Sequence, residues 1–173
     1  MVHYPSGLLS SMMVSGWLLD LDVKAALRRP PGDIPMGDFR ILEHTADVGF
    51  EAYGSTREET FANAARALIH LIVDLDSIEE REEVPIEAQG NGPENLLVNW
   101  LSEILYRHDA EGWLFRHFNI QSLADDSVHA VAQGEKFNRS RHRAKLLVKA
   151  ITYHQLALER TPDGWRARVY VDI

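Results

Sequence analysis

The sequence contains no cysteine among its 173 residues. Disulfide bonds, thiolate nucleophiles and zinc–thiolate centres are therefore excluded. Structural disulfides belong to oxidising compartments, so their exclusion is compatible with the cytoplasm, where we expect this protein to act. Catalytic signatures are missing too, because the chain has no glycine-rich phosphate loop, no nucleophile elbow and no His-x-x-x-His zinc helix. An enzyme that acts alone is poorly supported.

Positive charge is also scarce. Lys and Arg number 18 against 26 Asp and Glu, which gives a net charge of −8. Contacts to a phosphate backbone need a cationic surface, so we expect no direct specific binding of RNA. One basic segment is the exception, formed by Lys136, Arg139, Arg141, His142, Arg143, Lys145 and Lys149. This segment is either a solvated loop or a contact patch for an acidic surface or a phosphate.

The chain lacks an apolar run long enough to span a membrane. The stretch from Leu8 to Leu21 is broken by serines, a glycine and Asp20, and a span needs ~20 mostly apolar residues. No Lys or Arg precedes this stretch, as one would in a signal peptide. We therefore expect no membrane association. Residues 28–35 (RRPPGDIP) have the composition of a linker, so we interpret 1–37 as a poorly ordered N-terminal extension and 38–173 as the folded domain.

The first half of the domain predicts two strands and a helix. Residues 39–42 are apolar enough for a strand, and residues 48–54 alternate as a second strand. A helix follows from about residue 56 to about residue 73, with Ser55 as the N-cap and Glu58 completing a capping box. Its buried stripe consists of Phe61, Ala64, Ala65, Leu68, Ile69 and Ile72.

The second half predicts one more helix and five strands. The helix spans about residues 93–109, with Pro93 at its first position and Gly112 ending it. Pro85 cannot donate a main-chain hydrogen bond, so its strand, residues 84–88, belongs at a sheet edge. The remaining strands are expected at 114–122, 127–133, 146–159 and 165–171, with a hairpin turn at 161–164. The pattern predicts an α+β fold, a two-layer sandwich of a mixed, largely antiparallel sheet with two main helices.

Candidate chemistry lies at strand ends. Asp47 follows the first strand, and Asp172 stands beside the carboxylate of Ile173 after the last one. Carboxylate oxygens suit hard cations such as Ca²⁺ or Mg²⁺, although an aspartate in such a place is often only solvated. His44 with Asp47 is an alternative acid–base pair, which would make the protein a metal-dependent hydrolase. His154 lies five residues after Lys149, so without a bulge the two side chains point to opposite faces of their strand.

An ordered series of motifs resembles the archease family. The motifs are 43–49 (EHTADVG), 56–61 (TREETF), 96–103 (LLVNWLSE), 134–135 (GE), 141–142 (RH), 149–154 (KAITYH) and 172–173 (DI). The resemblance covers the chain from about Met36 to its last residue. Two departures are Asn138, where the family pattern leads us to expect Asp, and the N-terminal extension, which has no family counterpart.

The resemblance implies a protein that activates the RNA-splicing ligase RtcB in tRNA processing and tRNA splicing. Such a protein promotes guanylylation of the ligase and its multiple turnover, while the ligase holds the RNA and performs the chemistry. The resemblance also implies a metal site built from Asp47, Asp172 and Ile173, with Lys149 functionally important nearby. Ca²⁺ is the expected cation, and Mg²⁺ or Mn²⁺ are the alternatives.

Overall fold

The structure is a computed structural model that describes residues 39–44 and 47–173. Residues 1–37, interpreted above as an extension, lie outside the described residues. No helix in the described ranges is long and apolar enough to cross a membrane. The elements are β1 (Phe39–His44), β2 (Asp47–Gly54), α2 (Arg57–Ile72), η1 (Leu75–Ser77), β3 (Glu82–Gln89), α3 (Pro93–Glu111), β4 (Trp113–Leu123), β5 (Ser127–Lys136), β6 (Ala150–Thr161) and β7 (Gly164–Asp172).

The described strands form two antiparallel sheets. The first sheet has the order β1-β2-β7-β6, and the second has the order β3-β5-β4. Pro85 lies in β3, an edge strand of the second sheet, as its missing N–H group predicts. In the first sheet the last strand, β7, lies between β2 and β6. The first sheet therefore joins strands from both ends of the domain.

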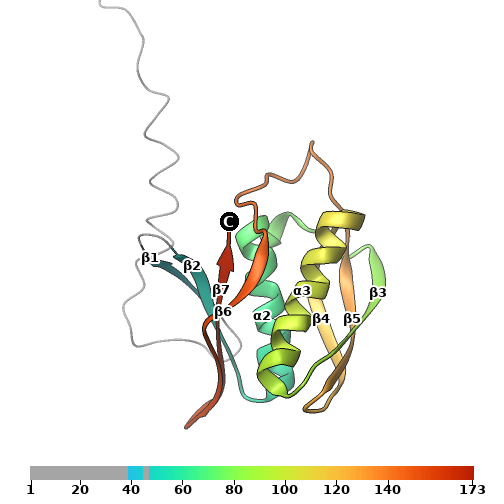
Figure 1. The fold of residues 1–173 in the computed structure, drawn as a ribbon. Helices are drawn as coiled ribbons and strands as arrows, with labels where there is room; N and C mark the ends of the chain where they lie inside the picture. Colours follow the sequence, from blue (N-terminus) through green and yellow to red (C-terminus); the bar gives the residue numbers. More distant parts are fainter. Residues whose placement is uncertain (1–38, 45–46) are drawn as a thin grey trace, which may run out of the picture. The chain divides into compact units, whose positions relative to one another are not determined.

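Helices α2 and α3 lie between the two sheets (Figure 1). Helix α2 packs on β2 of the first sheet and on β4 of the second, while α3 packs on β6 and β3. Trp100 of α3 is fully buried and donates its indole N–H to the main-chain oxygen of Phe61 in α2 at 3.2 Å. The α+β class with two main helices is confirmed, and the structure adds that the strands divide into two sheets.

The start of α2 differs by one residue from its prediction. The N-cap is Thr56, whose hydroxyl oxygen accepts from the Glu59 N–H at 3.1 Å. The Glu59 carboxylate in turn accepts from the N–H of Ser55 at 2.7 Å, so the predicted pair of Ser55 and Glu58 was wrong. Both Ser55 and Thr56 have a glutamate three residues later, and the sequence alone does not distinguish the two frames.

Helix α3 and the last hairpin match their predictions. Pro93 opens α3, and Gly112 ends it in the left-handed conformation with φ 74°. The turn between β6 and β7 contains Gly164 at φ 142°, where a Cβ atom would lie 2.2 Å from the main-chain oxygen of Gly54. Glycine is therefore required at this turn both by its φ angle and by the close approach of β2.

Strand β6 begins four residues later than predicted. Residues 146–149 alternate like a strand, yet they belong to a long connection, residues 137–149, that runs from the second sheet to the first. This connection is held by main-chain contacts with the end of α2. Lys145 donates its N–H to the oxygen of Ile72 at 2.8 Å, and Ala144 forms an isolated bridge with Val73. The prediction of strand at 146–149 was wrong: the preceding residues Ala144 and Lys145 pair with the end of α2, and the register with β7 begins only at Ala150.

Candidate functional site

The strand register brings three chain segments to one end of the first sheet. Val48 in β2 pairs with Val171 in β7, so Asp47 and Asp172 each lie one residue further toward that end. On the other side of β7, Ala150 at the start of β6 pairs with Asp172. The backbone therefore places Asp47 and Asp172 on neighbouring strands, close to the point where the 137–149 connection enters the sheet.

Lys149 contacts the end of β7 through two hydrogen bonds. Its main-chain N–H donates to the oxygen of Asp172 at 2.7 Å, and its Nζ donates to the main-chain oxygen of Ile173 at 3.1 Å. All three residues are exposed. We call Lys149, Asp172 and Ile173 the strand-end cluster. It presents an ammonium group, a side-chain carboxylate and the main-chain oxygens of the last residue together at the surface.

The other predicted residues are placed by their backbone alone. Asp47 is the first residue of β2 and pairs with His44, the last residue of β1. The side chains of Asp47 and His44 lie outside the part of the chain that the structure describes. The register thus brings Asp47 to the same sheet end as the strand-end cluster, and it also keeps His44 and Asp47 opposite each other.

The donors at this sheet end suit a hard cation. Asp172 and the terminal carboxylate of Ile173 supply only oxygen, the ligand type that Ca²⁺ and Mg²⁺ prefer. Among the described residues no group of three His, Asp or Glu side chains converges on one point. A site here therefore needs the terminal carboxylate and the Asp47 side chain in addition to Asp172. One terminal oxygen already accepts from Lys149, so the ammonium group lies within reach of the same donors.

Most of the basic segment has internal partners. Lys136 donates to the main-chain oxygen of Glu111 at 2.7 Å and lies 3.9 Å from the centre of the Trp113 ring. Lys145 donates to the main-chain oxygen of His70 at 3.2 Å. The segment is therefore largely an anchored connection, although Arg139 and Arg143 within it are exposed.

Glu135 holds the start of this connection. Its carboxylate is 4% exposed and accepts from the Glu79 N–H at 2.7 Å, from His142 Nε2 at 3.1 Å and from Arg141. His142 Nδ1 accepts the Asn138 N–H at 2.9 Å, so Nε2 carries the proton donated to Glu135. Burial by itself would raise the pKa of Glu135, but these donors outweigh it and the pKa is lowered. We call Glu135, Arg141 and His142 the buried clamp, after its two buried members Glu135 and His142; Arg141 is exposed.

A second buried carboxylate lies on the first sheet. Glu51 is 2% exposed and accepts from Arg40 at 2.6 Å, from Tyr53 at 2.6 Å and from Arg168 Nε at 2.9 Å. Burial acts to raise the pKa of Glu51, yet the bonds from Tyr53 and the arginines lower it overall. Burial and the Glu51 carboxylate raise the pKa of Tyr53 to about 12. Sequence reasoning missed this network because its members come from three separate strands, β1, β2 and β7.

A bulge interrupts β6 shortly after the strand-end cluster. Thr152 pairs with Tyr170, but the next pair is Ala157 with Arg168. Within the bulge Gln155 has φ 49°, an uncommon conformation for a residue other than glycine. The prediction that Lys149 and His154 point to opposite faces of one strand assumed regular pairing. The bulge interrupts that pairing, so the prediction does not apply here.

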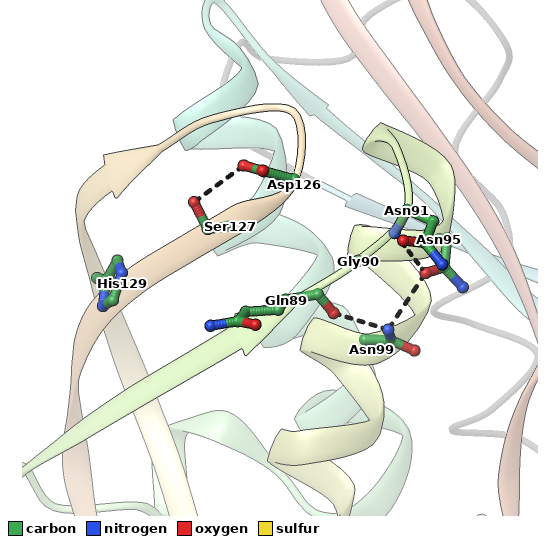
Figure 2. Close-up of a pocket in the computed structure, with 8 residues that line it drawn as sticks. All are labelled: Gln89, Gly90, Asn91, Asn95, Asn99, Asp126, Ser127 and His129. Carbon is green, nitrogen blue, oxygen red and sulfur yellow. Dashed lines mark hydrogen bonds between the residues drawn. The ribbon is translucent and has the colours of Figure 1, made fainter.

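A polar cleft of about 600 Å³ lies where β3 meets α3 (Figure 2). Its lining consists of Gln89, Gly90, Asn91, Asn95, Asn99, Asp126, Ser127 and His129. Asn99 donates to the main-chain oxygen of Gln89 at 2.7 Å, and Asn95 accepts from the Asn91 N–H at 2.8 Å. Two of these amide side chains therefore hold the turn between β3 and α3. None of the lining residues belongs to the strand-end cluster.

Comparison with known proteins extends these observations. The archease protein family (MTH1598/TM1083) matches residues 39–173. An archease from Pyrococcus furiosus is 44% identical over 142 residues, which cover 80% of this chain and 100% of that protein. An archease from Methanopyrus kandleri is 42% identical over 135 residues, covering 76% of this chain and 96% of the relative.

Solved structures show the same fold. The solution structure of Methanobacterium thermoautotrophicum protein 1598 is 31% identical with a TM-score of 0.67, covering 80% of this chain and 100% of that one. A crystal structure from Thermotoga maritima, described as an archease and possible chaperone, is 23% identical with a TM-score of 0.50. It covers 78% of this chain and 96% of that one, and at this identity it supports the fold alone.

Proposed function

Because this chain belongs to the archease family, we propose that it is an accessory activator of an RtcB-type RNA-splicing ligase. In this role it promotes guanylylation of the ligase and its multiple turnover during tRNA splicing. The ligase holds the RNA and forms the covalent bonds. A net charge of −8 agrees with a helper that contacts a protein rather than an RNA backbone.

The observation that carries this proposal is the register of the first sheet. The start of β2, the end of β7 and the end of the 137–149 connection bring Asp47, Asp172 and Lys149 to one end of the sheet. Exposed charge at a rigid sheet end is available to a partner, because the neighbouring strands fix its position and only solvent covers it. These positions are also the ones that the family resemblance singles out.

The residues of this end fit a divalent cation, with Ca²⁺ the first choice and Mg²⁺ or Mn²⁺ as alternatives. Asp47, Asp172 and the terminal carboxylate of Ile173 would hold it through oxygen. A cation bound there supplies concentrated positive charge to which a phosphate oxygen can bind. Lys149 adds a positive charge at the same end, and its bond to Ile173 orients the terminal carboxylate.

A ligation assay tests the proposal. The cognate ligase, purified in active form and present below the RNA concentration, is incubated with GTP and RNA with or without this protein. We expect this protein to raise both the guanylylated fraction of the ligase and the number of ligations per ligase molecule. Unchanged guanylylation and turnover would contradict the proposal. A chaperone, in contrast, would raise the yield of folded ligase without changing the turnover of ligase that is already active.

The hydrolase alternative rests on the pairing of His44 with Asp47. It predicts phosphoesterase activity of the isolated protein that needs a divalent cation and is lost in His44→Ala. Isolated protein without such activity, combined with ligase stimulation that survives His44→Ala, favours the activator. A third alternative, an acidic binding module without a metal, predicts ligase binding that chelators leave unchanged.

A further inference from the structure

The bulge in β6 is larger than a single extra residue. Between the pairs Thr152–Tyr170 and Ala157–Arg168, residues 153–156 of β6 lie opposite the single residue Val169 of β7. Tyr153, His154 and Gln155 are exposed, and Gln155 has φ 49°. Bulges of this kind redirect side chains, and uncommon backbone conformations persist where the surrounding structure enforces them. The bulge therefore calls for a functional explanation.

The side chain that the bulge redirects is His154. Its ring meets the Tyr170 ring edge-on, with ring centres 5.6 Å apart and ring planes at 64°. The Tyr170 ring itself lies against β2, because a Cβ atom on Gly49 would be 2.8 Å from Tyr170 Cδ1. Gly49 thus leaves room for this ring. Together Tyr170 and His154 form two sides of an aromatic corner, which we call the ring corner.

The ring corner lies on the outer face of the first sheet. Val169 and Val171 are buried toward the helices, so Tyr170, Arg168 and Asp172 alternate onto the opposite face of β7. Tyr170 is two residues from Asp172, about 7 Å along the strand. Arg168 is two residues away on the other side, and its Nε is bonded to Glu51 at 2.9 Å. That bond fixes the guanidinium and leaves its terminal N–H groups outside the contact.

We propose that the outer face of the first sheet binds a nucleotide, with the base in the ring corner and the phosphate at Arg168. Aromatic side chains on a sheet stack on bases of any sequence, and a guanidinium held by a neighbour binds phosphate oxygens in its own plane. One base and one phosphate require only local positive charge. The acidic balance of the whole chain, which disfavours a long RNA backbone, is therefore compatible with this site.

Nucleotide binding at the ring corner is a property beyond ligase activation and does not depend on it. It is therefore tested on the isolated protein, without the ligase. Full-length protein with isotope-labelled His and Tyr is titrated with GMP, and ring signals are followed by NMR. We expect saturable shifts of the His154 and Tyr170 signals. His154→Ala and Tyr170→Leu should each weaken GMP binding at least tenfold. His117→Ala removes an exposed histidine of the second sheet and should leave it unchanged.

Parallel titrations separate the contributions of base and phosphate. Guanosine should shift the same ring signals with lower affinity, and Arg168→Gln should bring the affinity for GMP down to that for guanosine. Pyrophosphate that moves the ring signals as GMP does would contradict the base contact. Absence of GMP binding at millimolar concentration, equal binding by all variants, or binding of an acidic peptide but not of GMP would each overturn the proposal. Thermal melting of His154→Ala, whose side chain is exposed, verifies that the fold is intact.

Discussion

The connection of residues 137–149 joins two charged regions that differ in almost every respect. It starts next to the buried clamp, where Glu135 is 4% exposed and surrounded by donors. It ends at the strand-end cluster, where Lys149 and Asp172 are exposed. The first region has its charges satisfied by the protein itself. The second keeps its charges in contact with water.

This difference separates stability from function. A buried ion that loses one partner costs several kcal/mol, whereas an exposed pair contributes about 1 kcal/mol or less. We therefore infer that the buried clamp fixes the path of the connection and that the strand-end cluster is free to bind something else. Substitutions in the buried clamp should mainly lower stability, whereas substitutions in the strand-end cluster should mainly lower activity.

The largest expected effect is on activity, at the strand-end cluster. Asp172→Ala, or extension of the chain beyond Ile173, should reduce ligase stimulation to the level of the ligase alone, because each removes or displaces an oxygen donor. Calorimetric titration with Ca²⁺ or Mn²⁺ should show weaker binding in both variants and in Asp47→Ala. The melting temperature should change by no more than about 2 °C, since the side chain of Asp172 is exposed.

Asp109→Ala, an exposed aspartate near the end of α3, is the matched control and should behave like the wild type. Equal cation affinity in all variants would dismiss the metal site. Normal ligase stimulation by all of them would dismiss its role in activation.

The second effect is on stability, at the buried clamp. Glu135→Ala should lower the free energy of unfolding by about 3–5 kcal/mol, because it removes the acceptor of His142 and of the Glu79 N–H and leaves Arg141 with only its bond to the Glu79 carboxylate. Urea unfolding measures the change. Glu159→Ala breaks a pair with Arg166 in which the carboxylate side chain is 47% exposed, and it should cost about 1 kcal/mol or less. Similar losses of unfolding free energy in the two variants would contradict the distinction between buried and exposed charges.

The smallest effect is a change in pH dependence. The folded-state pKa of Glu135 is lowered, so its contribution to stability is fully present above its unfolded pKa near 4.5 and is lost as the pH falls through the folded value. Glu135→Gln should therefore be most destabilising above the unfolded pKa near 4.5 and approach the wild type as the pH falls through the lowered folded-state pKa. Glu51 and Glu59 have lowered pKa values as well, so the variant should keep part of the acid sensitivity. The free energy of unfolding is measured for both proteins as a function of pH. A difference between wild type and variant that is constant with pH would contradict this assignment.

Local patterns predicted most elements of the fold. Proline at the start of α3, glycine at its end and the turn at 161–164 act through their own backbone geometry, so the sequence reveals them directly. Local patterns did not predict the division of the strands into two sheets. Helix α2 buries residues such as Asn63 and Leu71 outside the predicted stripe, because a helix between two sheets is covered on two sides.

The candidate site was predictable only as a set of residues. The motifs named Asp47, Lys149, Asp172 and Ile173, but their proximity depends on β7 lying between β2 and β6, which no local pattern encodes. The buried clamp and the bulge at Gln155 were missed for related reasons. The clamp joins side chains whose partners depend on the path of a loop, and a bulge leaves no mark in an alternating sequence.

The position of β7 also has a consequence for the order in which the protein folds. Strand β7 follows every other strand in the chain, yet it is central in the first sheet. During synthesis α2, α3 and the three strands of the second sheet emerge before β7, while the edge of β2 that later pairs with β7 stays open. The first sheet is thus completed only after β7 has been synthesised, and until then its unpaired edges are open to incorrect partners.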